Sequence, residues 1–155
     1  MSRLKKISLV LLFVLIGIQF IQPARNTGGQ AVQADVTKQF SVPANVAGTL
    51  KVACYDCHSN STAYPWYARI QPVGWLLAQH IKDGKADLNF NAFGSYTKRV
   101  QLSKLKAIEN SIKDGTMPLA SYTMLHAGAK LSNQQQTLII DWAAKTRDSI
   151  EANNQ

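Results

Sequence analysis

Residues 54–58 read CYDCH and hold both cysteines of the 155-residue chain, with a histidine directly after the second one. Two cysteines at this spacing serve three kinds of chemistry: thiol–disulfide exchange, tetrahedral zinc binding and covalent attachment of haem. Each chemistry needs further residues. Whether the rest of the sequence supplies them distinguishes the three chemistries.

Zinc binding and thiol exchange both require partners that the sequence does not supply. A zinc site needs about four ligands, usually a second Cys-x-x-Cys pair or two closely spaced histidines. The remaining histidines, His80 and His126, stand far apart in the chain. A thiol oxidoreductase would place its cysteine pair between a strand and a helix of a βαβ unit, and no such pattern surrounds this motif. Both alternatives are disfavoured.

Covalent haem attachment uses all three residues of the motif. C-x-x-C-H is the recognised signature of this attachment. Cys54 and Cys57 lie about one helical turn apart, so both sulfur atoms can reach the two vinyl groups on one edge of a porphyrin. His58 then lies beneath the ring, where it can give a nitrogen to the iron. The motif therefore predicts one covalently bound haem c, with His58 as the proximal axial ligand.

The other axial position of the iron has four candidate ligands, which are Met117, Met124, His80 and His126, and it could also stay open. Met117 lies in the stretch DGTMPL, where Pro118 disfavours a helical conformation of the methionine. A methionine on an extended loop can point at a metal, although most methionines fill a core. For His80 and His126 a structural role, such as capping a helix end or bonding a backbone carbonyl, is the simpler expectation.

Four aromatic residues follow the motif closely: Tyr64, Trp66, Tyr67 and Trp75. Aromatic side chains of a small domain usually belong to its core. Beside a haem motif, we expect Tyr64, Trp66 and Trp75 also to form the wall of the haem pocket. A dry, apolar wall disfavours the extra charge of ferric iron and so raises the reduction potential.

The chain after residue 43 is dominated by helical patterns. Helices are predicted over residues 44–54, 72–83 and 97–114, with Gly84 and Gly115 as the ends of the second and third. Ser132 and Gln135 form a capping box that opens a last helix. No segment alternates as a strand would, so the sequence predicts an all-α, cytochrome c-like domain over residues 46–150.

The N-terminus has the pattern of an export segment. Arg3, Lys5 and Lys6 precede an apolar run from residue 7 to residue 21. As a helix this run is roughly 22 Å long, against about 30 Å for the apolar core of a bilayer. We predict a retained membrane helix over residues 1–22, with the remainder of the chain on the periplasmic side of the inner membrane.

The alternative is cleavage that releases a soluble periplasmic protein. Val32-Gln33-Ala34 has the small residues that a cleavage site needs, although it lies far downstream. Residues 23–45 are rich in Gly, Ala, Gln and Pro, and they are predicted to be a linker between membrane and domain.

The net charge of the chain is +8. Three positive charges belong to the export segment, which leaves 14 Lys and Arg against 9 Asp and Glu, a net charge of +5, for the exported part. No run of like charge is long, so most of these groups are expected to form a solvated surface. A mildly basic face could dock an acidic redox partner. Nucleic acid is disfavoured because no basic-aromatic motif is present.

Several separated segments carry a family resemblance. CYDCHSNSTAYPWYARIQPVGW, HIKDGKADLNF, MPLASYTMLHAGAKLS and a helix ending in DWA resemble the exported haem-binding domain family common in Bacteroidetes-type bacteria. The order of elements is also similar to that of a small single-haem cytochrome c. The resemblance covers about residues 50–145. It implies an N-terminal membrane anchor, one c-type haem on Cys54, Cys57 and His58, and Met117 as the distal ligand.

Together these features predict a membrane-anchored carrier of one electron rather than an enzyme. In the alternative reading, an open or labile sixth site would make the protein a haem peroxidase or a sensor of small gases. A structural haem domain without redox turnover is the third hypothesis.

Overall fold

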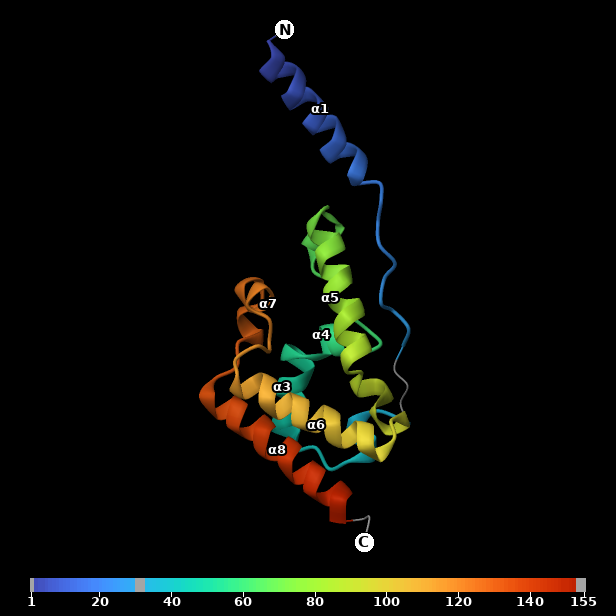
Figure 1. The fold of residues 1–155 in the computed structure, drawn as a ribbon, viewed down its shortest axis with the longest axis vertical. Helices are drawn as coiled ribbons and strands as arrows, with labels where there is room; N and C mark the ends of the chain where they lie inside the picture. Colours follow the sequence, from blue (N-terminus) through green and yellow to red (C-terminus); the bar gives the residue numbers. More distant parts are fainter. Residues whose placement is uncertain (1, 30–32, 153–155) are drawn as a thin grey trace.

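The computed structural model describes residues 2–29 and 33–152, and all regular elements in these ranges are helical (Figure 1). The helices are α1 (Arg3–Ile18), α2 (Val36–Gln39), α3 (Ala44–Ala53), α4 (Tyr55–His58), α5 (Val73–Asp87), α6 (Lys98–Lys113), α7 (Ala120–Leu125) and α8 (Asn133–Ala152), with the 3-10 turns η1 (Trp66–Arg69), η2 (Phe90–Ser95) and η3 (Ala127–Ala129). One isolated antiparallel bridge joins Thr27 to Ser61. The predicted all-α class is confirmed.

Local sequence signals place several helix ends where they were predicted. The Ser132 N–H donates to Gln135 Oε1 at 2.9 Å and the Gln135 N–H donates to Ser132 Oγ at 3.2 Å, so the capping box opens α8. Beyond α6, Gly115 adopts a φ of +66°, which glycine accepts without a steric penalty. The exception is α5, which runs through Gly84 to Asp87 instead of stopping there.

Helices α6 and α8 pack along each other and form the centre of the core (Figure 1). The apolar face of α6, with Leu105 and Ile112, is buried in one cluster with Ile139 and Ala143 of α8. Phe90 and Phe93 from η2 also belong to this core cluster. Burial of one such aliphatic or aromatic side chain is worth about 1.5–3 kcal/mol, so this pair of helices supplies much of the stability of the domain.

A buried carboxylate also joins α6 to α8. Glu109 is almost fully buried, and its Oε1 accepts a hydrogen bond from Arg147 Nη1 at 2.6 Å. Lys106 Nζ approaches Glu109 Oε2 at 3.2 Å from the solvent side. A buried charge is tolerated only when it is paired in this way, so Arg147 and Glu109 fix the relative position of the two helices.

Part of the predicted linker belongs to the folded domain. Val36 is fully buried in the core, and Phe40 packs edge-on against Phe93 with ring centroids 5.8 Å apart. The carboxylate of Asp35 accepts a 2.6 Å hydrogen bond from Asn91. The apolar residues here are single and separated by polar ones, so the segment shows no periodicity although it contributes to the core. Of the suggested cleavage site, Val32 lies outside the described residues.

The end of the predicted membrane segment and the start of the predicted linker are tied to the domain as well. Gln19 makes a paired contact with the backbone of Gln71: its Nε2 donates to Gln71 O at 3.2 Å, and its Oε1 accepts from Gln71 N at 2.9 Å. Gln22 Nε2 donates to Arg69 O at 3.1 Å, and Asn26 Nδ2 donates to Ser59 O at 2.9 Å. We call residues 19–29 the strap, because they run along the domain in an extended path (Figure 1).

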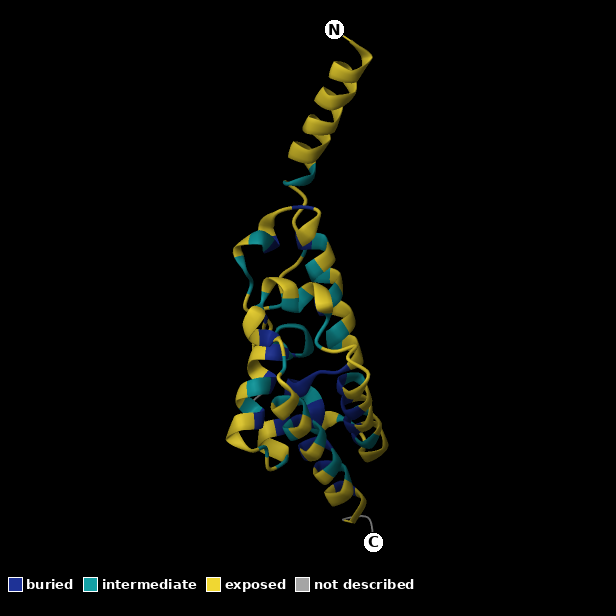
Figure 2. Cartoon of the chain, turned by 90° about the vertical axis from the view of Figure 1, so that its left-hand side faces the viewer, coloured by how far each residue is buried: buried dark blue, intermediate teal, exposed yellow. Residues whose placement is uncertain are grey.

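Helix α1 projects away from the domain and none of its residues is buried (Figure 2). It has 16 residues and ends at Ile18, where Gln19 turns the chain toward the strap. Over the two described ranges no helix is both long enough and apolar enough to cross a membrane. The prediction of a membrane-spanning helix over residues 1–22 is therefore not met, because the helix stops four residues before Gln22.

Asn91 offers a test of how the N-terminal segment is held. Its side chain is buried, with Nδ2 donating to Asp35 and Oδ1 accepting from the Asn60 N–H at 2.8 Å. Asn91→Ala leaves both partners without this bond, so we expect the free energy of unfolding to fall by about 2–3 kcal/mol. Urea denaturation measures the change. Asn110→Ala, at an exposed position of α6, is the control and should stay within about 0.5 kcal/mol of the wild type.

Candidate haem site

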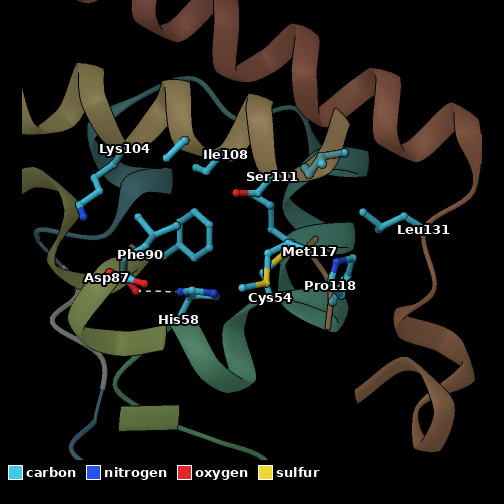
Figure 3. A pocket seen from close by; sticks show the side chains of 15 residues that line it. Cys54, His58, Asp87, Phe90, Lys104, Ile108, Ser111, Met117, Pro118 and Leu131 are labelled. Carbon is cyan, nitrogen blue, oxygen red and sulfur yellow. Dashed lines mark hydrogen bonds between the residues drawn. The ribbon is translucent and has the colours of Figure 1, made fainter. Parts of the chain in front are cut away.

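A cleft of about 270 Å³ opens beside the CYDCH motif, between α3, α4 and α6 (Figure 3). Its walls are mostly apolar, with Leu50 from α3, Ile108 from α6 and Phe90 after α5. Lys104 and Ser111 add two polar groups from α6. Figure 3 shows Cys54, His58 and Met117 around this same cleft.

The ring of His58 is oriented by the last turn of α5. His58 Nδ1 lies 2.7 Å from the carbonyl oxygen of Gly84 and 3.1 Å from that of Leu88. Carbonyl oxygens only accept hydrogen bonds, so Nδ1 carries the proton. In the neutral ring the lone pair is then on Nε2, the nitrogen that remains for a metal. A backbone acceptor behind a histidine is the usual support of a metal-ligating imidazole.

Gly84 makes this contact between α5 and the motif sterically possible. A Cβ atom at position 84 would lie 3.1 Å from Cys57 Cβ, 3.2 Å from the Cys57 carbonyl oxygen and 3.4 Å from His58 Cε1. Position 84 therefore suits glycine because α5 approaches the motif closely there. The backbone φ of Gly84 is not in the left-handed region, so conformational freedom is not the reason. Sequence reasoning read Gly84 as a helix end, and for this reason it missed a residue of the site.

The two cysteines lie on one turn, as the spacing predicted. The N–H groups of Cys57 and His58 both donate to the Cys54 carbonyl, at 3.2 and 2.9 Å. Burial raises the pKa of Cys54 to about 12, with a further contribution from Cys57. Burial and the nearby Asp56 carboxylate raise the pKa of Cys57 to about 11. Thiols that act in disulfide exchange have lowered pKa values, so this environment does not suit that chemistry.

Met117 reaches the cleft from the loop after α6. The backbone N–H groups of Thr116 and Met117 both donate to the Ser111 carbonyl, at 3.0 and 3.2 Å. These bonds hold the loop against the end of α6, and Met117 lies outside any helix, as Pro118 predicted. Its side chain is 37% exposed, so the cleft is open on this side.

The alternative axial ligands are placed elsewhere. His80 lies on α5 and does not line the cleft. Met124 on α7 is 80% exposed. His126 stacks on the ring of Tyr122 with centroids 4.1 Å apart, and its Nε2 lies 3.3 Å from the hydroxyl of Tyr67. The structure thus brings Met117, and none of these three residues, into the cleft with His58.

The predicted aromatic wall is wrong. Tyr64, Trp66 and Trp75 do not line the cleft. The Tyr64 hydroxyl accepts a hydrogen bond from the Asn26 N–H at 2.7 Å, and Trp75 Nε1 donates to the Ile21 carbonyl at 2.9 Å, so both hold the strap. Trp66 is 79% exposed. The chain leaves α4 in an extended segment, and Tyr64 and Trp75 contact the strap instead of the cleft despite their proximity to the motif in sequence.

A hydrogen-bonded group around Asp56 was not found from the sequence. Asp56 lies between the two cysteines. Its Oδ2 accepts from the Tyr122 hydroxyl at 2.7 Å, and its Oδ1 accepts from the Ala63 N–H at 3.1 Å. The first bond ties α7 to the motif. Burial, followed by this bond to Asp56, raises the pKa of Tyr122. Tyr122 is 66 residues from Asp56, and no local pattern links them.

Comparison with known proteins now adds to this geometry. Residues 13–145 match the model of a haem-binding domain family. The chain belongs to this haem-binding domain family. The chain is also 34% identical over 127 residues to a protein named cytochrome c peroxidase Ccp from Escherichia coli strain K12. That alignment covers 79% of this chain but 27% of the relative, so the chain spans about a quarter of that protein. No solved structure matches the chain significantly.

The residues at the cleft fit the group that the family binds. A histidine nitrogen with a fixed lone pair, a cysteine thiol and a thioether sulfur are donors used in c-type haem sites, and the walls are apolar. Cys57 lies on the same turn as Cys54 but is not among the residues that line the cleft. Zinc would need further ligands, and no group of three or more His, Cys, Asp and Glu side chains is gathered for a metal ion in the part of the chain that the structure describes.

Replacing Gly84 tests the close packing of α5 on the motif. We expect Gly84→Val to displace Cys57 and His58, to lower the free energy of unfolding by about 1–3 kcal/mol and to reduce the haem content per polypeptide. The control is Gly48→Val, because Gly48 also lies within a helix but a Cβ there meets nothing within 4 Å. Equal haem content in the two variants would contradict this role of Gly84.

The raised pKa of Tyr122 predicts a loss of stability in alkali. An unfolded tyrosine ionises near pH 10, whereas folded Tyr122 keeps its proton to higher pH. Above about pH 10 the unfolded state therefore binds fewer protons than the folded state, and the free energy of unfolding falls as the pH rises. Tyr122→Phe should cost about 1–2 kcal/mol at pH 7, and its stability should fall less steeply between pH 9 and 11. A slope equal to that of the wild type would show that Tyr122 ionises as freely in the folded protein.

Proposed function

We propose that this domain carries one haem c, joined by thioether bonds to Cys54 and Cys57. His58 Nε2 is the proximal ligand and the Met117 sulfur is the distal ligand. The observation that carries the proposal is that one apolar cleft gathers Cys54, Met117 and a histidine whose Nδ1 is already occupied by the Gly84 carbonyl. Conversion of both thiols into thioethers also agrees with their burial, since a buried thioether carries no ionisable group.

The function supported best is transfer of a single electron. The bound haem would supply the one-electron chemistry, and the protein holds its ligands in fixed positions. The Gly84 and Leu88 carbonyls restrain His58, and the Ser111 carbonyl restrains the loop of Met117. Apolar walls and a methionine ligand both favour the ferrous state and raise the potential. Lys104 at the cleft and the net positive charge suit an acidic redox partner.

A peroxidase or small-gas site is the second candidate. The similarity to a protein named cytochrome c peroxidase and the exposure of Met117 favour it. Peroxide cleavage would require an acid–base group on the distal side, such as a histidine or an arginine. Of the described residues that line the cleft, His58 is the sole histidine, and no arginine accompanies it. Asp87 and Lys104 also line the cleft and can move protons, so the carrier is favoured by the position of Met117 at the cleft and not by the lack of an acid–base group.

The basic start and the apolar helix support export of the chain to the periplasmic side of the inner membrane. The strap supports retention of the N-terminal segment, because Gln19, Gln22 and Asn26 each bond to the domain. Mass spectrometry of the purified protein tests both points: residues 1–29 should be present in the mature chain.

Replacement of Met117 distinguishes the carrier from the peroxidase. If methionine ligates the iron, Met117→Leu should lose the six-coordinate ferric spectrum, lower the reduction potential and let the reduced protein bind carbon monoxide quickly. Met124→Leu, an exposed methionine seven residues away, is the matched control and should behave as the wild type. An unchanged spectrum and potential in Met117→Leu would exclude methionine ligation, and fast carbon monoxide binding by the wild type would favour an open site.

A further inference from the structure

The end of the domain from which α1 projects carries a group of exposed apolar side chains. We call Phe20, Trp66, Ile70, Val73 and Leu76 the basal patch. Phe20 is 83% exposed, Trp66 79% and Leu76 56%, and the other two are also exposed. They come from the strap, from η1 and its end, and from the first turn of α5, which meet at this end of the molecule (Figures 1 and 2).

Hydrogen bonds make the basal patch and α1 one continuous surface. Gln19 pairs with the backbone of Gln71, and Gln22 donates to the Arg69 carbonyl, so Phe20 is fixed beside η1. Trp75 Nε1 donates to the Ile21 carbonyl from the first turns of α5. The apolar helix therefore does not hang from a free linker. It is joined to an apolar surface of the domain through hydrogen-bonded residues of the strap.

The two chain segments that supply the basal patch carry charges of one sign. Residues 1–34 and residues 57–82 contain no Asp or Glu, although the whole chain has nine. The same two segments contain six cationic residues: Arg3, Lys5, Lys6, Arg25, Arg69 and Lys82. A surface that combines exposed apolar and aromatic side chains with cations alone matches an anionic lipid bilayer, whose headgroups attract Lys and Arg and whose interface accommodates Trp.

A lipid surface also suits α1 better than a protein groove does. A helix that docks in a groove has one apolar face and one polar face. The apolar residues of α1 are exposed on all sides, and none is buried. At 16 residues it is about 24 Å long, so its apolar side chains can enter the lipid while Arg3, Lys5 and Lys6 at its start extend to the headgroups.

We propose that the basal patch rests on an anionic bilayer surface, with α1 inserted in the lipid and the strap as a rigid joint. Helix α5 then sets the height of the haem cleft. It begins at Val73 in the patch and ends at Asp87, and its Gly84 carbonyl accepts the hydrogen bond of His58. Its 15 residues span about 22 Å, so the cleft is held about 20 Å above the lipid. A redox partner must reach that height.

Vesicle flotation of the full-length haem-loaded protein tests the role of the patch. The double variant Trp66→Ser/Leu76→Ser keeps α1 and all cations, and should bind vesicles containing phosphatidylglycerol at least about tenfold more weakly than the wild type. The control is Val52→Ser/Val100→Ser, which removes two exposed valines from α3 and α6 and should bind like the wild type. Vesicles of phosphatidylcholine alone should bind all three proteins weakly. Equal binding of both double variants to the anionic vesicles would overturn the proposal.

Hydroxyl-radical footprinting with mass spectrometry gives a second readout that does not require a variant. Addition of anionic vesicles should protect Trp66 from oxidation at least about fivefold, because its side chain leaves water. Protection of Trp66 without lipid, at a protein concentration where sedimentation shows a dimer, would assign the patch to a second copy of the chain and overturn the proposal. Full reactivity of Trp66 in vesicle-bound protein would also overturn it, since α1 alone would then hold the protein at the bilayer.

Discussion

The contact between His58 and the last turn of α5 is the constraint on which the site depends. The Gly84 carbonyl accepts the proton of Nδ1, and this leaves Nε2 free on the side of the cleft. The bond is short because residue 84 has no side chain, so α5 can approach Cys57 and His58 closely. Helix α5 is in turn held by the strap at its other end, through Gln71 and Trp75. The position of the imidazole thus rests on the packing of one helix.

Both residues between the cysteines also support the motif. The ring of Tyr55 stacks on Phe90 with centroids 5.1 Å apart, and its hydroxyl lies 3.4 Å from Asp35 Oδ2. Asp56 accepts a hydrogen bond from Tyr122 of α7. The turn that carries Cys54 and Cys57 is therefore fixed from the N-terminal segment on one side and from α7 on the other.

Local chemistry explains what could be predicted from the sequence. The CYDCH turn, the capping box at Ser132 and the loop position of Met117 each depend on residues a few positions apart, and the structure has them as expected. Contacts between distant segments were not predictable in this way. The aromatic residues near the motif fold onto the strap, and Phe90 and the aliphatic face of α6 form the walls instead. The role of Gly84 could not be predicted from the sequence for the same reason, because it depends on which residues α5 packs against.

Covalent attachment of haem through Cys54 and Cys57 is the central claim, and one measurement tests it directly. The purified protein is extracted with acidified organic solvent, and the polypeptide is then treated with a thiol-alkylating reagent and weighed by mass spectrometry. The account predicts that the haem stays with the polypeptide, in a ratio of one to one, and that neither cysteine is alkylated. Release of the haem into the solvent, together with alkylation of both cysteines, would contradict it.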